Sequence, residues 1–160
     1  MTAMKSLLPD AARQVAAGAL QSTLVDLLGL SLIGKQTHWN VVGPRFRSVH
    51  LQLDELVTEV REAADKVAER AATLGVPPDA CPATIASAIA LPVPRADWVR
   101  DDEAIEIVTE ALHIAVTRLR KCIEATENSD PVTQDLLISV TAELEKQHWM
   151  FAAAHTAHAR

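Results

Sequence analysis

Histidines and carboxylates at helical spacings are the residues of this sequence whose types could do chemistry. His38 lies near the end of one apolar segment, and His50, Asp54, Asp65 and Glu69 follow within the next segment. No cysteine lies near them, so the donor set consists of imidazole nitrogens and carboxylate oxygens. Such a set suits a divalent first-row metal such as ferrous iron, and carboxylates also stabilise the ferric product. The pattern therefore predicts an iron-oxidising site.

The spacing of these residues excludes a site built within one helix. Asp54 and Asp65 are eleven positions apart, which is roughly 16 Å along a helix axis. Positions 54 and 65 share the midpoint 59.5 with positions 50 and 69, as a two-fold axis crossing this helix would require. We therefore predict two symmetric sites per dimer, each with His50 and Asp54 from one subunit, Asp65 and Glu69 from its mate, and His38 from the preceding helix.

Apolar residues recur at helical rather than strand spacing along the whole chain, which predicts an all-α fold. The second helix should run from Phe46 to Leu74, with Phe46 among the residues that face its own core. Its flank alternates the candidate ligands with Ala64, Ala68 and Ala72, small residues that would let a second helix approach closely.

Capping residues, glycines and prolines divide the chain into four main helices and one short helix. The expected ranges are 10–36, 46–74, 82–90 (the short helix), 101–128 and 131 onward. A long connection between the second and third main helices describes a ferritin-like four-helix bundle, with the short extra helix in that crossover. A length of 160 residues predicts one domain, 1–160.

Composition narrows the classes of function. A net charge of −6 argues against a surface that attracts phosphates everywhere, whereas an acidic interior or pore would suit cations. The two cysteines are too few for a disulfide framework. No signal-peptide pattern or uninterrupted apolar stretch of about 18 residues is present, so we expect a cytoplasmic protein without a membrane segment.

The motif around the candidate ligands resembles the Dps family, the DNA-binding proteins from starved cells. The resemblance implies a dodecameric hollow shell that oxidises ferrous iron at inter-subunit ferroxidase sites, preferably with hydrogen peroxide, stores the ferric mineral and protects against oxidative damage. It assigns the ligands to His38, His50, Asp54, Asp65 and Glu69, a site that zinc could occupy as a surrogate. The matching residues are Lys35-Gln36-Thr37-His38-Trp39-Asn40, Gly43, Phe46, His50-x-x-x-Asp54, Asp65-x-x-Ala68-Glu69-Arg70 and Leu74-Gly75.

The family name also implies DNA binding, and here the sequence departs from the better-known members. Those members use a mobile lysine-rich tail, whereas the segment before Pro9 offers only Lys5. Affinity for phosphates needs several clustered cations. DNA compaction, and with it a structural nucleoid protein, is therefore the less favoured alternative.

A competing enzyme hypothesis comes from Glu110-x-x-His113 and Glu145-x-x-His148. Paired motifs of this kind build the site of ferritin-like di-iron oxidases inside a single bundle. However, Glu110 and His113 lie on a polar helix face, and the first helix contains no glutamate for the fourth carboxylate. We expect these residues to face solvent or a neighbour.

Several other residues allow both a functional and a structural interpretation. Trp39 is an oxidisable neighbour of His38 that could donate an electron, although packing is the commoner role of a bundle tryptophan. Asp130, Asp135 and Glu143 could line an acidic pore for iron uptake, or could serve as helix cap and surface charge.

Two further interpretations concern the end of the chain and the flank of the second helix. His155 and His158 are one helical turn apart and could bind a second metal, although a frayed helix end is the simpler explanation. For the flank of the second helix, the structural alternative is a network of exposed salt bridges that involves Arg61.

Overall fold

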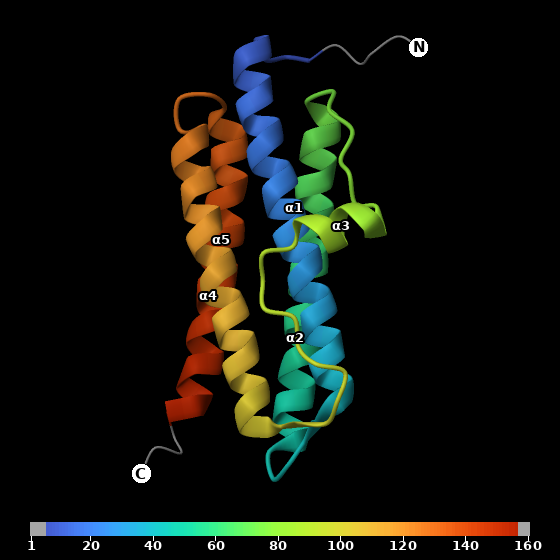
Figure 1. The fold of residues 1–160 in the computed structure, drawn as a ribbon. Coiled ribbons are helices and arrows are strands. Elements are labelled where there is room, and N and C mark those ends of the chain that lie inside the picture. Colours follow the sequence, from blue (N-terminus) through green and yellow to red (C-terminus); the bar gives the residue numbers. More distant parts are fainter. Residues whose placement is uncertain (1–5, 157–160) are drawn as a thin grey trace.

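The structure is a computed structural model that describes residues 6–156, with side chains through residue 154. Four long helices, α1 (Asp10–Asn40), α2 (Phe46–Thr73), α4 (Asp101–Thr126) and α5 (Pro131–Thr156), form the bundle shown in Figure 1. The short helix α3 (Pro82–Ala88) lies in the long crossover between α2 and α4. The predicted all-α ferritin-like bundle with an extra crossover helix is confirmed.

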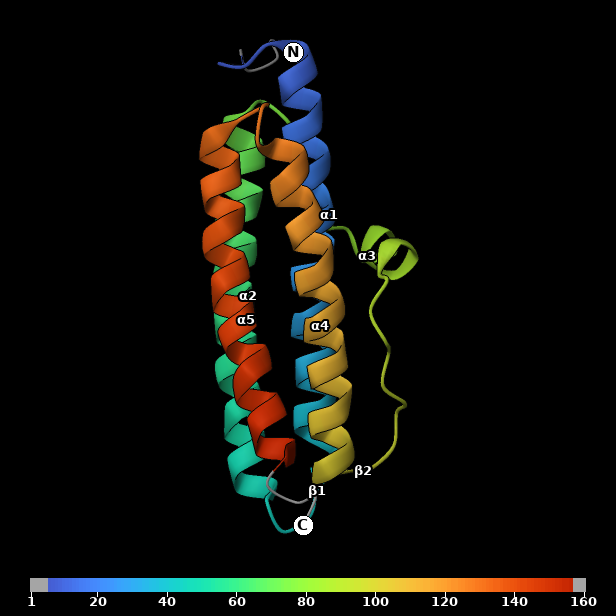
Figure 2. The same cartoon turned by 90° about the vertical axis from the view of Figure 1, so that its left-hand side faces the viewer.

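The helices form two closely packed pairs, α1 with α2 and α4 with α5, and α1 also packs against α4. The crossover runs along the outside of this bundle, and α3 stands away from it on the side of α1 (Figure 2). Two-residue strands, β1 (Val41–Val42) and β2 (Val99–Arg100), pair in parallel and join the α1–α2 turn to the start of α4.

The predicted helix boundaries are correct within a few residues, with one consequential error. Helix α1 continues to Asn40 rather than ending near Gln36, and the Asn40 side chain donates a hydrogen bond to the Gln36 carbonyl. His38 is therefore held rigidly within a helix. Helices α3 and α4 each end two residues earlier than expected. Helix α2 ends at Thr73, and Gly75, two residues later, adopts a positive φ of 75°.

The buried stripe of α2 agrees with the apolar pattern, with one exception. Phe46 is 44% exposed, because it is the first residue of α2 at the end of the bundle and has no facing helix to cover it. The other predicted core positions are buried, namely Val49, Leu53, Leu56, Val60, Ala63, Val67, Ala71 and Leu74.

Helix α1 is the one described helix that is long and apolar enough to cross a membrane by length and composition. Its apolar 18-residue window is 67% buried inside the bundle. A central helix that packs against two neighbours must be apolar on most of its surface, so the fold accounts for this composition.

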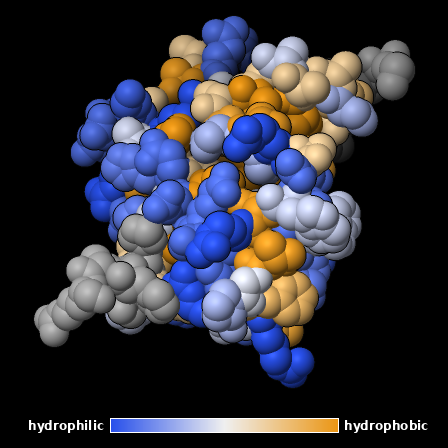
Figure 3. Space-filling view, turned by 60° about the horizontal axis from the view of Figure 1, so that its bottom comes forward, coloured by the Kyte–Doolittle hydropathy of each residue, from blue (hydrophilic) through white to orange (hydrophobic). Residues whose placement is uncertain are grey.

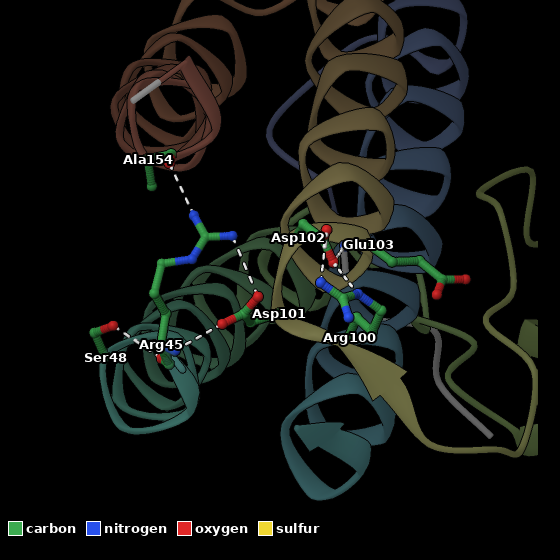
Figure 4. A network of polar contacts seen from close by, with 7 residues as sticks. All are labelled: Arg45, Ser48, Arg100, Asp101, Asp102, Glu103 and Ala154. Carbon is green, nitrogen blue, oxygen red and sulfur yellow. Dashed lines mark hydrogen bonds and ion pairs between the residues drawn. The ribbon is translucent and has the colours of Figure 1, made fainter. Parts of the chain in front are cut away.

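A polar network closes the end of the bundle where the α1–α2 turn lies (Figure 4). Arg45 donates its backbone N–H to Asp101 Oδ2 at 2.6 Å and its guanidinium to Asp101 Oδ1 at 3.3 Å and to the Ala154 carbonyl at 3.1 Å. Burial alone would raise the pKa of Asp101, but the hydrogen bonds from Arg45 lower that pKa below its usual value. Three helix ends are thereby joined, and Figure 3, tilted to bring this end forward, shows hydrophilic side chains with hydrophobic patches between them.

Candidate metal centre

His38 and His50 meet where the end of α1 faces the start of α2. Their rings stack with centroids 3.6 Å apart and planes 20° apart. His38 Nδ1 lies 2.9 Å from the His50 carbonyl, and His50 Nδ1 lies 3.0 Å from the His38 carbonyl. A carbonyl accepts only from a ring N–H, so Nδ1 carries a proton in both rings, and the neutral form of each ring has its lone pair on Nε2. Histidines that bind metals are typically oriented by such a bond on the other ring nitrogen.

Asp54 joins these two histidines and is also bound by a lysine. Its Oδ1 lies 3.6 Å from His38 Nδ1, and the Lys35 ammonium contacts the same oxygen. The hydrogen bond from Lys35, together with the positive charge of its ammonium, lowers the pKa of Asp54. Asp54 is therefore an ionised carboxylate beside two oriented imidazoles. The Lys35 ammonium contacts this carboxylate, which would equally attract a metal cation.

Asp65 and Glu69 lie farther along α2 and are exposed. The spacing along the helix keeps them away from Asp54 and the histidine pair. In residues 6–154 no group of three or more His, Cys, Asp or Glu side chains is arranged to hold a metal ion. A single subunit thus presents the five predicted ligands as two separate groups.

The flank of α2 does not form the exposed salt-bridge network that was its structural alternative. Arg61 Nε donates a hydrogen bond to Ser31 Oγ at 2.8 Å, and no ion pair joins it to an acidic side chain in the described part of the chain. Of the small residues on this flank, Ala64 is buried in its own bundle. Ala68 and Ala72 remain partly exposed and could face a second helix.

An apolar groove is lined in part by Lys35, which contacts Asp54, and by Trp39, which follows His38. It has a volume of about 790 Å³, and α1, α3 and the crossover form its walls. Leu32 and Trp39 of α1 line this groove and are 57% and 65% exposed. Trp39 therefore does not pack into its own bundle, and the packing role anticipated for it within the bundle is wrong.

The residues predicted for an uptake pore have different environments. Asp130 is 2% exposed, receives a hydrogen bond from Arg70 at 2.6 Å and contacts the Thr133 hydroxyl at the start of α5. Burial would raise the pKa of Asp130, but the bonds from Thr133 and Arg70 lower it. The pore role of Asp130 is therefore corrected to that of a buried cap, whereas Asp135 and Glu143 are exposed.

The residues of the competing intrachain oxidase lie outside the bundle core. Glu110 and His113 are exposed, and Arg120 Nε donates to Glu145 Oε1 at 2.7 Å. An intrachain di-iron site of this kind is therefore not assembled. The rings of His113 and His148 nevertheless lie 5.9 Å apart, a contact that sequence reasoning missed. His158 and the side chain of His155 lie outside the part that the structure describes.

Sequence reasoning also missed the roles of Lys35 and Phe46 near the ligands. Lys35 precedes His38 by one helical turn, a spacing that places both side chains on one face. Phe46 packs against the His50 ring with centroids 4.9 Å apart, and the spacing of four residues could have shown this. The hydrogen bonds between the histidines and the backbone had no signal in the sequence, because they depend on how the two helices meet.

Comparison with known proteins agrees with this architecture. The family of ferritin-like domains matches residues 17–158, which defines the class of protein. The DNA protection during starvation protein of Mycolicibacterium smegmatis is 42% identical over 148 residues, covering 87% of this chain and 75% of that relative. The chain belongs to the Dps family.

Solved structures give the same result. The tetragonal form of Mycobacterium smegmatis Dps has a TM-score of 0.90 and 36% sequence identity, covering 96% of this chain and 94% of that chain. Dps from Microbacterium arborescens in the high iron form has a TM-score of 0.90 and 28% identity, covering 96% and 99%. Membership places this protein among oligomeric ferritin-like proteins. Their general roles are iron storage and the protection of DNA or of the cell from oxidative damage.

Proposed function

We propose that this protein is a cytoplasmic ferroxidase that oxidises ferrous iron, preferably with hydrogen peroxide, at di-iron sites between subunits and stores the ferric product inside a dodecameric shell. The observation that carries the proposal is the His38–His50 pair, in which each ring is tied through Nδ1 to the backbone of the other residue. Both Nε2 atoms are then left to bind ferrous iron next to the ionised Asp54. Iron here is the substrate, and zinc would act only as a non-oxidisable surrogate.

The second half of the site comes from the partner subunit in this proposal. Asp65 and Glu69 are exposed on the same helix as His50 and Asp54, and the shared midpoint of the four positions fits an antiparallel crossing at a two-fold axis. The apolar groove, whose lining includes Lys35 and Arg61, exposes hydrophobic surface of the kind that a second subunit would cover. Each dimer would thereby complete two identical sites.

The proposed reaction transfers one electron from each of two ferrous ions to a peroxide molecule, which takes up protons and is reduced to water. Carboxylate ligands stabilise the ferric products, which then move to the store. Trp39 is exposed beside His38 and could supply an electron when a single ferrous ion is present. We propose that iron reaches the interior past Asp135 and Glu143, the two exposed carboxylates of the predicted pore.

Mixing two inactive variants tests the sharing of the site between subunits. One variant carries His50→Ala and Asp54→Ala, and the other carries Asp65→Ala and Glu69→Ala. Each alone should lose peroxide-driven iron oxidation, measured optically. After dissociation and joint reassembly, a mixed dimer regains one intact site of its two, and half of random dimers are mixed, so about a quarter of the sites should return.

Reassembly of each variant alone, followed by mixing without dissociation, is the matched control and should stay inactive. A mixture that assembles to the size of the unmodified protein by light scattering but regains no activity would show that the two groups do not share a site. Light scattering of the unmodified protein also tests the dodecamer, and a stable monomer would refute it.

A DNA-coating function is the second candidate and rests on the name of the relatives, which refers to protection of DNA. The net charge of −6 opposes broad contact with phosphates. We therefore propose that any protection of DNA by this protein acts through removal of iron and peroxide. A gel-shift assay at low salt should show no retardation, and retardation at modest protein excess would restore the nucleoid alternative.

A further inference from the structure

We propose that His113 and His148 form a separate binding site for a divalent late first-row metal ion such as Zn²⁺, on the outer face between α4 and α5. The two residues come from neighbouring helices, and their rings lie 5.9 Å apart with planes at 42°. Neither belongs to the proposed ferroxidase site, which uses α1 and α2. The proposal therefore stands independently of the proposed iron oxidation.

The separation of the rings matches the geometry of two imidazoles on one ion. With Zn–N distances of about 2.0–2.1 Å, two histidine rings that share a zinc ion have centroids roughly 5–6 Å apart. The observed 5.9 Å falls within this interval, so rotation of the side chains would suffice and the helices need not move. No hydrogen bond among the described residues fixes either ring, and His113 is exposed to solvent.

Two glutamates reinforce the attraction for a cation at this place. Glu110 precedes His113 by one helical turn, and Glu145 precedes His148 by one turn, so each glutamate shares a helix face with a histidine. Arg120 binds Glu145 through Oε1, and no described contact uses Oε2. The Glu145 carboxylate, held by Arg120, therefore adds negative charge near the histidine pair without being a third ligand in this arrangement. Water would complete the shell.

Two imidazole nitrogen ligands suit Zn²⁺, Ni²⁺ or Cu²⁺ better than Mg²⁺ or Ca²⁺, which require oxygen ligands. An ion held by both histidines would link α4 to α5 at their exposed face. It would stabilise the folded chain, because the unfolded chain does not hold the two rings together.

Titration calorimetry with Zn²⁺ on the assembled protein tests this site. His113→Ala and His148→Ala should each remove one bound ion per chain, and the double variant should remove the same single ion and no more. This lack of additivity is the signature of an ion shared between two residues. Glu145→Gln and Glu110→Gln should each weaken binding of this ion only about twofold, through loss of a nearby negative charge.

Three controls make the outcome decisive. Iron oxidation in His113→Ala and His148→Ala should equal that of the unmodified protein, which shows intact folding and assembly. His50→Ala should leave this zinc ion in place, so failure of the ferroxidase hypothesis would be seen separately. If zinc binding is unchanged in the double variant, or if His155→Ala with His158→Ala removes the ion instead, the proposed site does not exist.

Discussion

The molecule contains two pairs of neighbouring histidines that differ in how firmly they are held. His38 and His50 stack at 3.6 Å, and each ring is tied to the backbone of the other residue. His113 and His148 lie 5.9 Å apart on the surface of α4 and α5, with no described hydrogen bond to either ring. The first pair is preorganised because Nδ1 of each ring is engaged, whereas the second can rotate to meet an ion.

This difference separates two kinds of metal chemistry. A reaction at a metal centre needs ligands held in one geometry, which the surrounding hydrogen bonds provide. A binding site without a reaction needs only donors within reach of a common ion. The α1–α2 pair therefore fits catalysis, and the α4–α5 pair fits binding of an ion at the surface.

Removal of one histidine from each pair should give the largest contrast. We expect His50→Ala to slow peroxide-driven iron oxidation roughly 100-fold or more, because even outer-shell partners of metal ligands typically contribute 10- to 100-fold. His113→Ala should leave the rate unchanged. Stopped-flow absorbance of ferric product measures both, and equal loss in the two variants would remove the distinction between the pairs.

The turn that brings the first pair together should be sensitive to glycine replacement. Gly43 has a φ of 133°, and an added Cβ would lie 2.8 Å from the Asp101 carboxyl group. Gly43→Ala should lower the free energy of unfolding by about 1–3 kcal/mol, with slower iron oxidation. Gly18→Ala meets nothing within 4 Å and should raise stability by about 0.5–1 kcal/mol. Urea unfolding measures both free energies, and equal values for Gly43→Ala and Gly18→Ala would show that the turn conformation does not matter.

Lowering the pH should destabilise the end of the bundle near His38 and His50, because Asp101 becomes protonated. Its pKa in the folded state is below the unfolded value, so its stabilisation is fully present above the unfolded pKa and is lost as pH falls through the folded pKa. Asp101→Asn should lower the free energy of unfolding by about 2 kcal/mol near neutral pH and flatten its decline in acid. Asp102 is less buried than Asp101 and its bonds to Arg100 lie at the surface, so Asp102→Asn should have a smaller effect. Similar unfolding curves for the two variants would contradict this account.

The smallest expected effect is a change in iron affinity when the Lys35 ammonium beside Asp54 is removed. Lys35→Met removes the ammonium from Asp54, so ferrous iron should bind about two- to fivefold more tightly, the range of a partly exposed ion pair. Lys66→Met, farther along α2, removes the same charge and should change affinity less. Anaerobic iron titration measures both, and weaker binding in Lys35→Met would mean that the lysine positions Asp54 for the metal.

Helix periodicity and capping residues were sufficient to predict the bundle and its crossover, because each helix shows its buried face every three or four residues. The five candidate ligands also followed from residue type and spacing alone. The errors arose where tertiary contacts override local pattern. The polar network and the β1–β2 pairing accompany an α1 that extends through His38 to Asn40, and Arg70 draws Asp130 into a buried pair.

Residue order along the chain was enough to show which donors exist, on which helices they lie and that no single helix could unite them, since rise and twist per residue are constants of the α-helix. It could not reveal that His38 and His50 exchange hydrogen bonds with each other's backbone, that Lys35 binds Asp54, or that His113 reaches His148. Those contacts join segments separated by 12 to 35 positions, and the packing of whole helices sets their distances.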